Sequence, residues 1–388
     1  MKNISQFFII LFCLICFHVE LKAQNVRTGA DRIEEYLPIL EGKRVGLVVN
    51  HTSVISSPEG NFVPLPDSLL SRGVQVKCIM APEHGYKGVA DAGEHLSNEE
   101  DANTGLKIYS LYGKTRKPQK EWLDEIDIVV FDMQDVGARF YTYLSTLKNV
   151  LEACGEQNKE VMVLDRPNPK DTIDGPVLDP KFESFVGCIP IPLLHGCTLG
   201  ELAQMMVGEE WAKMTNQLIV VPCSGWTHGQ EYDCPIAPSP NLPTPHAISL
   251  YPSLCLFEGT EVSVGRGTDF PFEVYGHPTM NKGKMSFSFT PKPSASNKNP
   301  LQNGKICMGE DLREIVPFKG FSLEYYLKAY KQLGASLITS VSFFDRLAGT
   351  DKLRKQILSG MNESQIRETW QADLSAYKET RAKYLIYE

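Results

Sequence analysis

Motifs of several common enzyme classes are absent from the 388 residues. No G-x-S-x-G elbow occurs, which disfavours a serine hydrolase of the usual α/β type. The stretch V-G-R-G-T-D-F (264–270) lacks the G-x-G-x-x-G spacing and does not follow a first strand. Nicotinamide binding therefore has little support.

An excess of positive charge is also absent. The chain carries 39 lysines and arginines against 47 aspartates and glutamates, a formal net charge of −8. This balance gives no electrostatic attraction to phosphate backbones, so nucleic acid is not an expected partner.

Only one long apolar run occurs, from Phe7 to Phe17, and it follows Lys2. A polar stretch that ends near Ala23 comes next, as is typical of a secretory signal over residues 1–23. The run is too short to span a membrane comfortably. We expect an exported protein, periplasmic or secreted after signal cleavage, without stable membrane insertion.

The only C-x-x-C pair, Cys13 with Cys16, lies inside this signal. Thioredoxin-type and zinc-ribbon sites therefore lose their motif. Eight cysteines remain in apolar surroundings, at positions 78, 154, 188, 197, 223, 234, 255 and 307. This distribution is compatible with disulfides and with buried free thiols.

Four near-continuously apolar runs in the first half indicate strands that are covered on both faces. They are residues 43–50, 74–81, 126–132 and 160–165. Between the last two, apolar residues at 144, 147, 150 and 151 follow helical spacing and complete a β-α-β unit. The first half is predicted to be an α/β domain with an open, mostly parallel sheet.

The pattern changes beyond about residue 190. Residues 198–211 indicate a helix whose N-cap, Thr198, forms a capping box with Glu201. Strand-like pieces follow, and a helical tail runs from about 350 to 385. We place a boundary near 185–195, so that an α/β domain spans 24–190 and a smaller α+β domain spans 191–388. The strand-like pieces include 217–223, 261–278 and M-S-F-S-F-T-P (285–291).

Each of the four predicted strands ends in polar residues. Ligands of open α/β sheets bind outside the carboxyl ends of the strands, so these clusters are expected to share one crevice. The clusters are Asn50-His51-Thr52, Glu83-His84, Asp132 through Asp135, and Asp165-Arg166.

Glu83 is the first candidate for chemistry. It follows a predicted buried strand, in the glycine-rich turn M-A-P-E-H-G-Y-K-G-V-A-D-A-G (80–93). A partly desolvated carboxyl group suits general acid catalysis at neutral pH. The alternative is that Glu83 only caps the element that follows.

A metal site is another interpretation of this turn. The pairs Glu83-His84 and Glu94-His95, with Asp91 between them, supply zinc-ligand types. Their spacing matches no ligand pattern, however, and neighbouring residues of an extended turn point apart. We therefore predict no metal.

The stretch F-D-M-Q-D-V-G-A-R-F-Y-T-Y (131–143) gathers carboxylates, a forked donor and aromatic faces, a mixture typical of sites for polyhydroxylated rings. An i,i+4 ion pair that starts a helix, worth about 0.3–0.5 kcal/mol, explains part of it equally well. The candidates are Asp132, Gln134, Asp135, Arg139 and Tyr141, and the ion pair would join Asp135 to Arg139.

Two more arginines lie in turns fixed by proline or glycine. They are Arg166 in L-D-R-P-N-P (164–169) and Arg266 in V-G-R-G-T-D-F-P-F-E (264–273). An arginine clamps a carboxylate through charge-assisted bonds of about 1.5–3 kcal/mol. An inter-domain or loop-fixing ion pair is the alternative for both.

Six longer motifs occur in the order seen in the NamZ-like exo-β-N-acetylmuramidases, which the chain resembles from about residue 30 to its C-terminus. The resemblance implies a Rossmann-like N-terminal domain, a smaller C-terminal domain, an active cleft between them and no redox cofactor. It also implies release of N-acetylmuramic acid from the non-reducing end of peptidoglycan fragments, with Glu83 as the catalytic glutamate. The motifs are P-E-H-G-Y-K-G, F-D-M-Q-D-V-G-A-R-F-Y-T-Y-L-S-T, L-D-R-P-N-P, S-F-V-G-C-I-P-I-P-L-L-H-G-C-T-L-G-E-L-A, S-P-N-L-P-T-P and L-F-E-G-T-E-V-S-V-G-R-G-T-D-F-P-F-E-V-Y-G.

These motifs and the strand ends together supply the candidate substrate contacts. Two positions depart from the family pattern and put fine specificity in question: Glu261 replaces an expected amide, and His277 an expected small residue. The candidate contacts are Asn50, His84, Gln134, Arg139, Tyr141, Arg166, Asn168, Asn241, Arg266 and Asp269.

The implied substrate carries a lactyl carboxylate, for which Arg266, Arg139 and Arg166 are candidates. Glu83 would protonate the leaving glycosidic oxygen, and His84 would position the sugar or tune Glu83.

The second catalytic group stays open at this point. Asp132 or Asp135 is suited to act as nucleophile or base, and a third route uses the substrate's own acetamido group. Two other functions remain as alternatives, a metal-dependent cell-wall amidase or deacetylase and a periplasmic sugar-binding protein without turnover.

Overall fold

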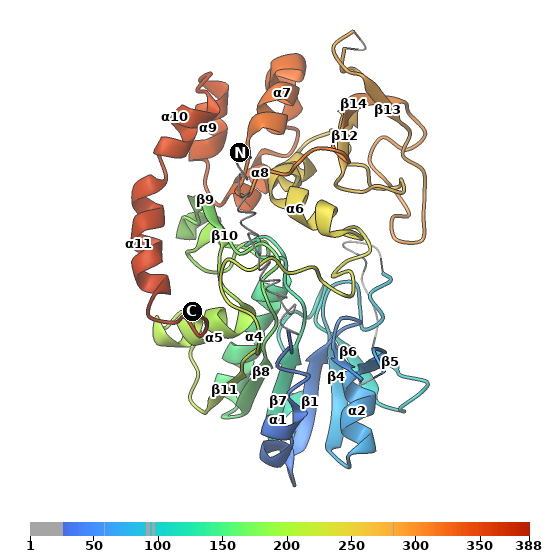
Figure 1. Cartoon of the computed structure of the whole chain (residues 1–388), viewed down its shortest axis with the longest axis vertical. Helices are drawn as coiled ribbons and strands as arrows, with labels where there is room; N and C mark the ends of the chain where they lie inside the picture. The colour runs from blue at the N-terminus through green and yellow to red at the C-terminus, as the bar shows by residue number, and fades with distance from the viewer. Residues whose placement is uncertain (1–25, 58, 91–93, 95–97, 282) are drawn as a thin grey trace, which may run out of the picture.

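The structure, a computed structural model, describes residues 26–57, 59–90, 94, 98–281 and 283–388. The predicted signal over residues 1–23 lies outside these ranges. Figure 1 shows a sheet with flanking helices in the lower half of the molecule, and further helices with short strands above it.

Residues 44–221 contribute the strands of a seven-stranded sheet in the order β11-β8-β7-β1-β4-β6-β5. Neighbouring strands are parallel, except for β5 with β6. The four predicted strands are confirmed as β1, β4, β7 and β8. The seven strands are β1 (Arg44–Val49), β4 (Gln75–Ala81), β5 (Glu99–Glu100), β6 (Lys107–Ser110), β7 (Ile128–Asp132), β8 (Glu160–Leu164) and β11 (Leu218–Val221).

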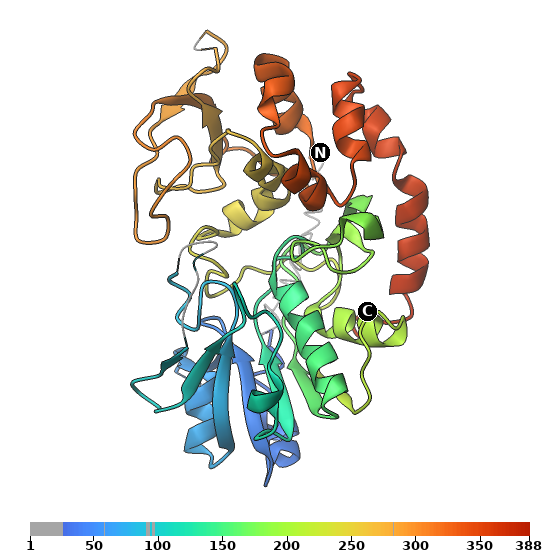
Figure 2. The same ribbon diagram turned by 180° about the vertical axis from the view of Figure 1, so that it is seen from behind.

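Alternate residues of these strands enter two hydrophobic cores, one on each face of the sheet. On one face, Leu47 and its neighbours pack with α1 (Ile33–Leu40) and α2 (Leu65–Ser71). On the other face, Val48 packs in the core formed with α4 (Tyr143–Glu156) and α5 (Leu199–Gly208). The opposite views in Figures 1 and 2 show each helix pair in turn in front of the sheet. This double cover explains the continuous apolar strands.

The predicted β-α-β unit is also confirmed, since α4 joins the parallel strands β7 and β8. The apolar positions 144, 147, 150 and 151 of this helix are all buried.

The remaining strands form small antiparallel sheets. β9 (Ile173–Val177) pairs with β10 (Pro192–His195), and β2 (Val54–Ser56) pairs with β3 (Phe62–Pro64). A three-stranded sheet follows the order β12-β14-β13, and β13 confirms the predicted strand at 285–291. Its strands are β12 (Val274–His277), β13 (Phe287–Phe289) and β14 (Cys307–Asp311).

The predicted helical tail is confirmed, although it consists of successive short helices. These are α9 (Lys352–Leu358), α10 (Glu363–Glu368) and α11 (Gln371–Arg381). The other helices are α3 (Lys120–Leu123), α6 (Pro245–Leu254), α7 (Glu324–Leu333) and α8 (Val341–Ala348), with 3₁₀ turns η1 (Pro180–Phe182), η2 (Cys255–Gly259) and η3 (Gly334–Leu337).

The predicted boundary near residue 190 does not follow the sheet. Strand β11 pairs in parallel with β8, although the prediction places residues 217–223 in the second domain. The change of pattern near 190 marks the β9-β10 hairpin, after which α5 leads the chain back to the edge of the first sheet. The first domain therefore includes residues well beyond 190.

All eight cysteines of the described chain are free thiols, and every one except Cys234 is fully buried. Burial raises the pKa of Cys78 and of Cys154 to about 12 in each case. The sequence was compatible with disulfides and with buried free thiols, and the structure shows free thiols at all eight positions. No helix among the described residues has both the length and the apolar character needed to cross a membrane.

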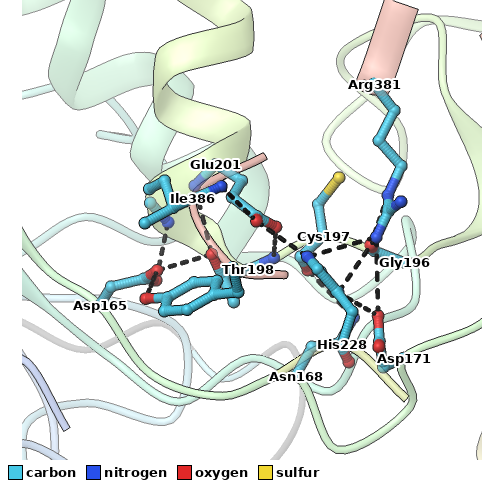
Figure 3. Close-up of polar contacts among 12 residues, drawn as sticks. Asp165, Asn168, Asp171, Gly196, Cys197, Thr198, Glu201, His228, Arg381 and Ile386 are labelled. Atoms are coloured by element: carbon cyan, nitrogen blue, oxygen red, sulfur yellow. Dashed lines mark hydrogen bonds and ion pairs between the residues drawn. The ribbon is translucent and has the colours of Figure 1, made fainter. Parts of the chain in front are cut away.

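The predicted capping box at the start of α5 is confirmed. Thr198 Oγ1 accepts the backbone N–H of Glu201 at 3.2 Å, and Glu201 Oε2 accepts that of Thr198 at 2.9 Å. The other oxygen of Glu201 accepts the backbone N–H of Ile386 at 2.9 Å, as Figure 3 shows. The cap of α5 thus also holds the C-terminal segment against the first domain.

His228 lies between two carboxylates in this network (Figure 3). Its Nδ1 is 3.0 Å from Asp171 Oδ1, and its Nε2 is 2.9 Å from Glu201 Oε1. Burial lowers the pKa of His228, but the hydrogen bonds to Asp171 and Glu201 outweigh this effect and raise it to about 9. The charged imidazolium is therefore the form present at neutral pH.

We predict that His228→Gln lowers the free energy of unfolding by about 1–2 kcal/mol at pH 6.5, because charge-assisted hydrogen bonds are lost. The folded-state pKa is raised above the ordinary value of about 6.5, so this stabilisation is complete below that pH and declines as pH rises through 9. Urea unfolding of both proteins between pH 6 and 10 measures the difference. A difference that grows toward pH 10 would contradict the prediction.

Candidate active site

A cavity of about 930 Å³ lies where the carboxyl end of the sheet meets the second part of the chain. Its volume is in the range of small-molecule sites. Of the four predicted polar clusters only Glu83-His84, after β4, lines this cavity. The prediction that all four share one crevice is therefore wrong, because the clusters after β1, β7 and β8 do not line it. Its walls come from residues 83–84, 112, 116, 140–143, 183–186, 239, 241–242, 251, 255, 258, 260, 262–264, 266, 272, 297, 299, 301, 343 and 346–347.

Glu83 lines this cavity, two residues beyond β4. Thr142 Oγ1 donates a hydrogen bond of 2.7 Å to Glu83 Oε2. Thr142 occupies the N-cap position of α4, but its side chain makes no capping bond there. Burial and the neighbouring Glu83, with which Tyr112 shares a hydrogen bond, raise the pKa of Tyr112. The Tyr112 hydroxyl therefore keeps its proton at neutral pH and donates to the carboxylate.

His84 fixes the turn that carries Glu83. It adopts a left-handed conformation, with φ of 68°, and its Nδ1 lies 2.8 Å from Ala90 O, so this nitrogen carries the proton. Nε2 lies 3.5 Å from the hydroxyl of Ser239, which also lines the cavity. Gly88 packs so closely that a Cβ atom there would lie 1.9 Å from His51 Nδ1, so this position requires glycine. The turn has little freedom to move Glu83.

Aromatic side chains form one wall of the cavity. The Tyr141 hydroxyl donates to Pro238 O at 2.8 Å. Tyr141 and Tyr251 meet edge to face at 6.1 Å between ring centroids, and Tyr251 meets Phe272 in the same way at 5.1 Å. Tyr141 therefore lies at the cavity as predicted, and its contact with substrate stays a prediction. Such fixed rings suit packing against a sugar.

Asp132 and Asp135 do not line the cavity. Asp132 is fully buried and accepts from Arg166 Nε at 2.5 Å and from Nη2 at 2.9 Å. Asp135 accepts the backbone N–H of Gly137 at 2.8 Å, and its Oδ2 lies 3.3 Å from His195 Nε2. The two predicted catalytic aspartates are thus enclosed behind the site, where they hold loops and cannot reach a substrate in this arrangement.

The structure also corrects the expectations for two arginines. The side chain of Arg166 is committed to Asp132 and to Val54 O, and neither it nor Arg139 lines the cavity. Arg139 is fully buried and donates to three backbone carbonyls. It therefore does not pair with Asp135, because its guanidinium points to other segments of the described chain.

Arg266, by contrast, lines the cavity. Its guanidinium is 5.1 Å from the centroid of the Phe272 ring and is hydrogen-bonded to Glu258. Burial alone would lower the pKa of Arg266, but Glu258 outweighs this effect and raises it. The loop-fixing ion pair foreseen as an alternative is present, and it lies at the cavity.

Three polar residues that were predicted to contact substrate instead make hydrogen bonds within the protein. Asn50 Nδ2 donates to the Tyr143 hydroxyl at 2.8 Å, and Gln134 Nε2 donates to Pro167 O at 2.9 Å. Asn168 Nδ2 donates to Cys197 O at 3.0 Å. Since none of the three lines the cavity, the predicted substrate contacts of Asn50, Gln134 and Asn168 are wrong in this arrangement.

Asn241 and Asp269 differ from each other. Asn241 lines the cavity, and its buried Nδ2 has no hydrogen-bond partner in the described chain. Asp269 is exposed and lies outside the cavity lining, because the turn after Arg266 directs it to solvent. The departures from the family pattern also lie outside: Glu261 is exposed, and His277 bonds with Thr279.

Sequence reasoning missed several cavity residues. Arg116 stacks 4.4 Å above the Phe185 ring, and the exposed Arg346 reaches the cavity from α8. Glu258 and Thr142 lie within motifs that carry the family resemblance, so those motifs could have identified both as candidate site residues. No feature of the sequence distinguishes Arg116 and Arg346, because surface arginines are common on any helix or loop.

The cluster considered for a metal is only partly described. Asp91 and His95 lie outside the described residues, and Glu94 bonds with Lys298 at 2.7 Å. Among the residues that the structure describes, no group of three or more His, Cys, Asp or Glu side chains is placed to hold a metal ion.

Comparisons with known proteins agree with this architecture. The model of the family described as exo-β-N-acetylmuramidase NamZ, N-terminal, matches residues 45–246, and that of the C-terminal domain matches residues 249–387. The peptidoglycan β-N-acetylmuramidase NamZ of Bacillus subtilis (strain 168) is 36% identical over 393 residues, which cover 94% of this chain and 92% of that protein.

Two solved structures of DUF1343 family proteins from Bacteroides fragilis NCTC 9343 share the fold. One has a TM-score of 0.85 and 41% identity, and covers 94% of this chain and 99% of its own. The other has a TM-score of 0.81 and 28% identity, and covers 94% and 100%. With both family models matched in order, the chain belongs to the NamZ family of exo-β-N-acetylmuramidases, which are glycosidases.

Proposed function

We propose that the chain releases N-acetylmuramic acid from the non-reducing end of peptidoglycan fragments. The observation that carries this proposal is the placement of Glu83, the glutamate of the P-E-H-G motif, on a cavity of about 930 Å³. The substrates are disaccharides or muropeptides with a terminal N-acetylmuramic acid. The predicted signal over residues 1–23 supports export to the periplasm or beyond, where such fragments arise.

Glu83 is the general acid of this proposal. It gives its proton to the glycosidic oxygen as the bond to the anomeric carbon breaks, which contributes about 10²–10⁴-fold to the rate. Thr142 holds Oε2 through its hydrogen bond, so the carboxyl group keeps one orientation. The aromatic wall that contains Tyr141 and Tyr251 supplies a face for the sugar ring.

Arg346 is the proposed partner of the lactyl carboxylate. It lines the cavity, and within the described chain its guanidinium makes no hydrogen bond or ion pair. The other arginine candidates are less suitable: Arg139 and Arg166 are enclosed, and Arg266 is already bonded to Glu258. A charge-assisted contact of this kind is worth about 1.5–3 kcal/mol.

Glu83→Gln is expected to lower kcat for an aryl β-N-acetylmuramide by about 10²–10⁴-fold, because the amide has no proton to donate. Release of the chromophore measures the rate, and the matching N-acetylglucosaminide is the control substrate. Equal wild-type rates on both sugars, or no hydrolysis, would refute the function. Full activity of Glu83→Gln would refute the mechanism alone and, if sugar still binds without turnover, would favour a binding protein.

Arg346→Gln is expected to lower kcat/KM for the same muramide by about 10–100-fold, mainly through KM, because one charge-assisted contact is lost. A substrate whose lactyl carboxylate is converted to an amide serves as the control and should show little difference between the two proteins. The matched variant is Arg116→Gln. A larger loss in that variant than in Arg346→Gln would move the carboxylate site to Arg116.

Chelator is expected to leave the rate unchanged, because proton donation by Glu83 needs no metal and no cluster of metal ligands is found among the described residues. The test is dialysis against EDTA, followed by the muramide assay with and without added zinc. A loss of activity that zinc restores would favour a metal-dependent amidase or deacetylase.

A further inference from the structure

Three carboxylates of the described chain line the cavity: Glu83, Glu183 and Glu258. The side chain of Glu183 is 54% exposed and lies 3.9 Å from Lys148, at the surface. That of Glu258 is only 25% exposed. Since Asp132 and Asp135 are enclosed behind the site, Glu258 is the cavity carboxylate that remains to face a substrate bound at Glu83.

The two oxygens of Glu258 have different surroundings. Oε1 accepts from Arg266 Nε at 3.2 Å and from Nη2 at 2.5 Å. Oε2 has a single contact among the described residues, the thiol of Cys255 at 3.9 Å. Arg266 therefore fixes the carboxylate through one oxygen, while the other is free to react.

The support for this carboxylate is rigid. Glu258 belongs to η2, which directly follows α6, and its neighbour Phe257 is fully buried against Tyr275 and Tyr326. Arg266 is itself held over the Phe272 ring. A reacting group needs such fixed surroundings to keep its geometry.

Glu258 also lies within electrostatic reach of the acid. Burial raises the pKa of Tyr112, and the charges of Glu83 and Glu258 add to this effect. Both carboxylates therefore act on the same hydroxyl, Glu83 from the first domain and Glu258 from the second.

We propose that Glu258 is the second catalytic carboxylate and acts on the anomeric carbon from the face opposite the leaving group, through Oε2. The proposal rests on the hydrolysis proposed above. As the glycosidic C1–O bond breaks, the proton of Glu83 passes to the leaving oxygen, and a new bond forms at C1. The electron balance is the same whether Oε2 forms that bond itself or removes a proton from the water that forms it. In the first case water later displaces Oε2, and Glu83 takes the water proton.

Two variants test the assignment against a purely structural role. Glu258→Gln keeps an oxygen for Arg266, so a structural role predicts a loss of less than about tenfold, whereas a catalytic role predicts at least about a hundredfold. Glu258→Ala opens space for azide, which should attack C1 in place of the missing carboxylate, restore release of the aryl group from the muramide and yield the α-glycosyl azide, identified by NMR. Glu261→Gln, exposed and three residues away, is the matched control.

The outcomes separate this inference from the proposed function. Hydrolysis by wild type with no azide rescue of Glu258→Ala, or a β-glycosyl azide, would overturn the role of Glu258 and leave the function intact. A Glu258→Gln variant within tenfold of wild type would do the same. Thermal unfolding and sugar binding of both variants identify any loss that comes from misfolding. Inactivity of wild type on the muramide would instead overturn the function.

Discussion

The buried guanidinium of Arg139 is the constraint on which the cavity depends. Its Nη1 donates to Pro176 O at 2.8 Å and to Ile191 O at 2.9 Å, and its Nη2 donates to Leu347 O at 3.1 Å. Burial lowers the pKa of Arg139 to about 9, which reflects the cost of placing a cation inside the protein without a carboxylate. Each carbonyl is held in place, because moving one away would remove one of the three hydrogen bonds that compensate this buried charge.

One of these carbonyls belongs to a residue that lines the cavity, and Arg139 itself directly precedes another lining segment. Residues 140–143, which follow Arg139 directly, line the cavity, and so does Leu347 in α8. Gly349 must be a glycine, because a Cβ atom there would lie 2.5 Å from Arg139 Nη2 and its φ is 74°. The wall that holds Thr142 and the wall that holds Arg346 are therefore attached to one side chain.

The sequence was sufficient for the four central strands of the sheet and for the position of Glu83 at the end of one of them, because both leave local signals. Strands buried on both faces require unbroken apolar runs, and the carboxyl end of such a strand limits where a polar turn residue points. Which side chain or strand a given residue will pair with leaves no such signal in the local sequence. Asp132 and Arg166 looked like site residues because they end adjacent strands, yet adjacency is also what allows them to neutralise each other. Similarly, nothing local predicts that β11 returns to the first sheet.

The division of the site between two domains has a consequence for its chemistry. Glu83 is positioned by a turn of the first sheet, and Glu258 by the 3₁₀ turn after α6, so no single element sets the distance between them. That distance depends on contacts that join the domains, among them the bond of Arg139 to Leu347. The separation of the two carboxylates decides how a glycosidase works: it is about 5–5.5 Å in a retaining enzyme and about 6.5–9.5 Å in an inverting one, so both groups must be held accurately. Buried inter-domain hydrogen bonds, which are costly to break, supply that accuracy where loops alone would not.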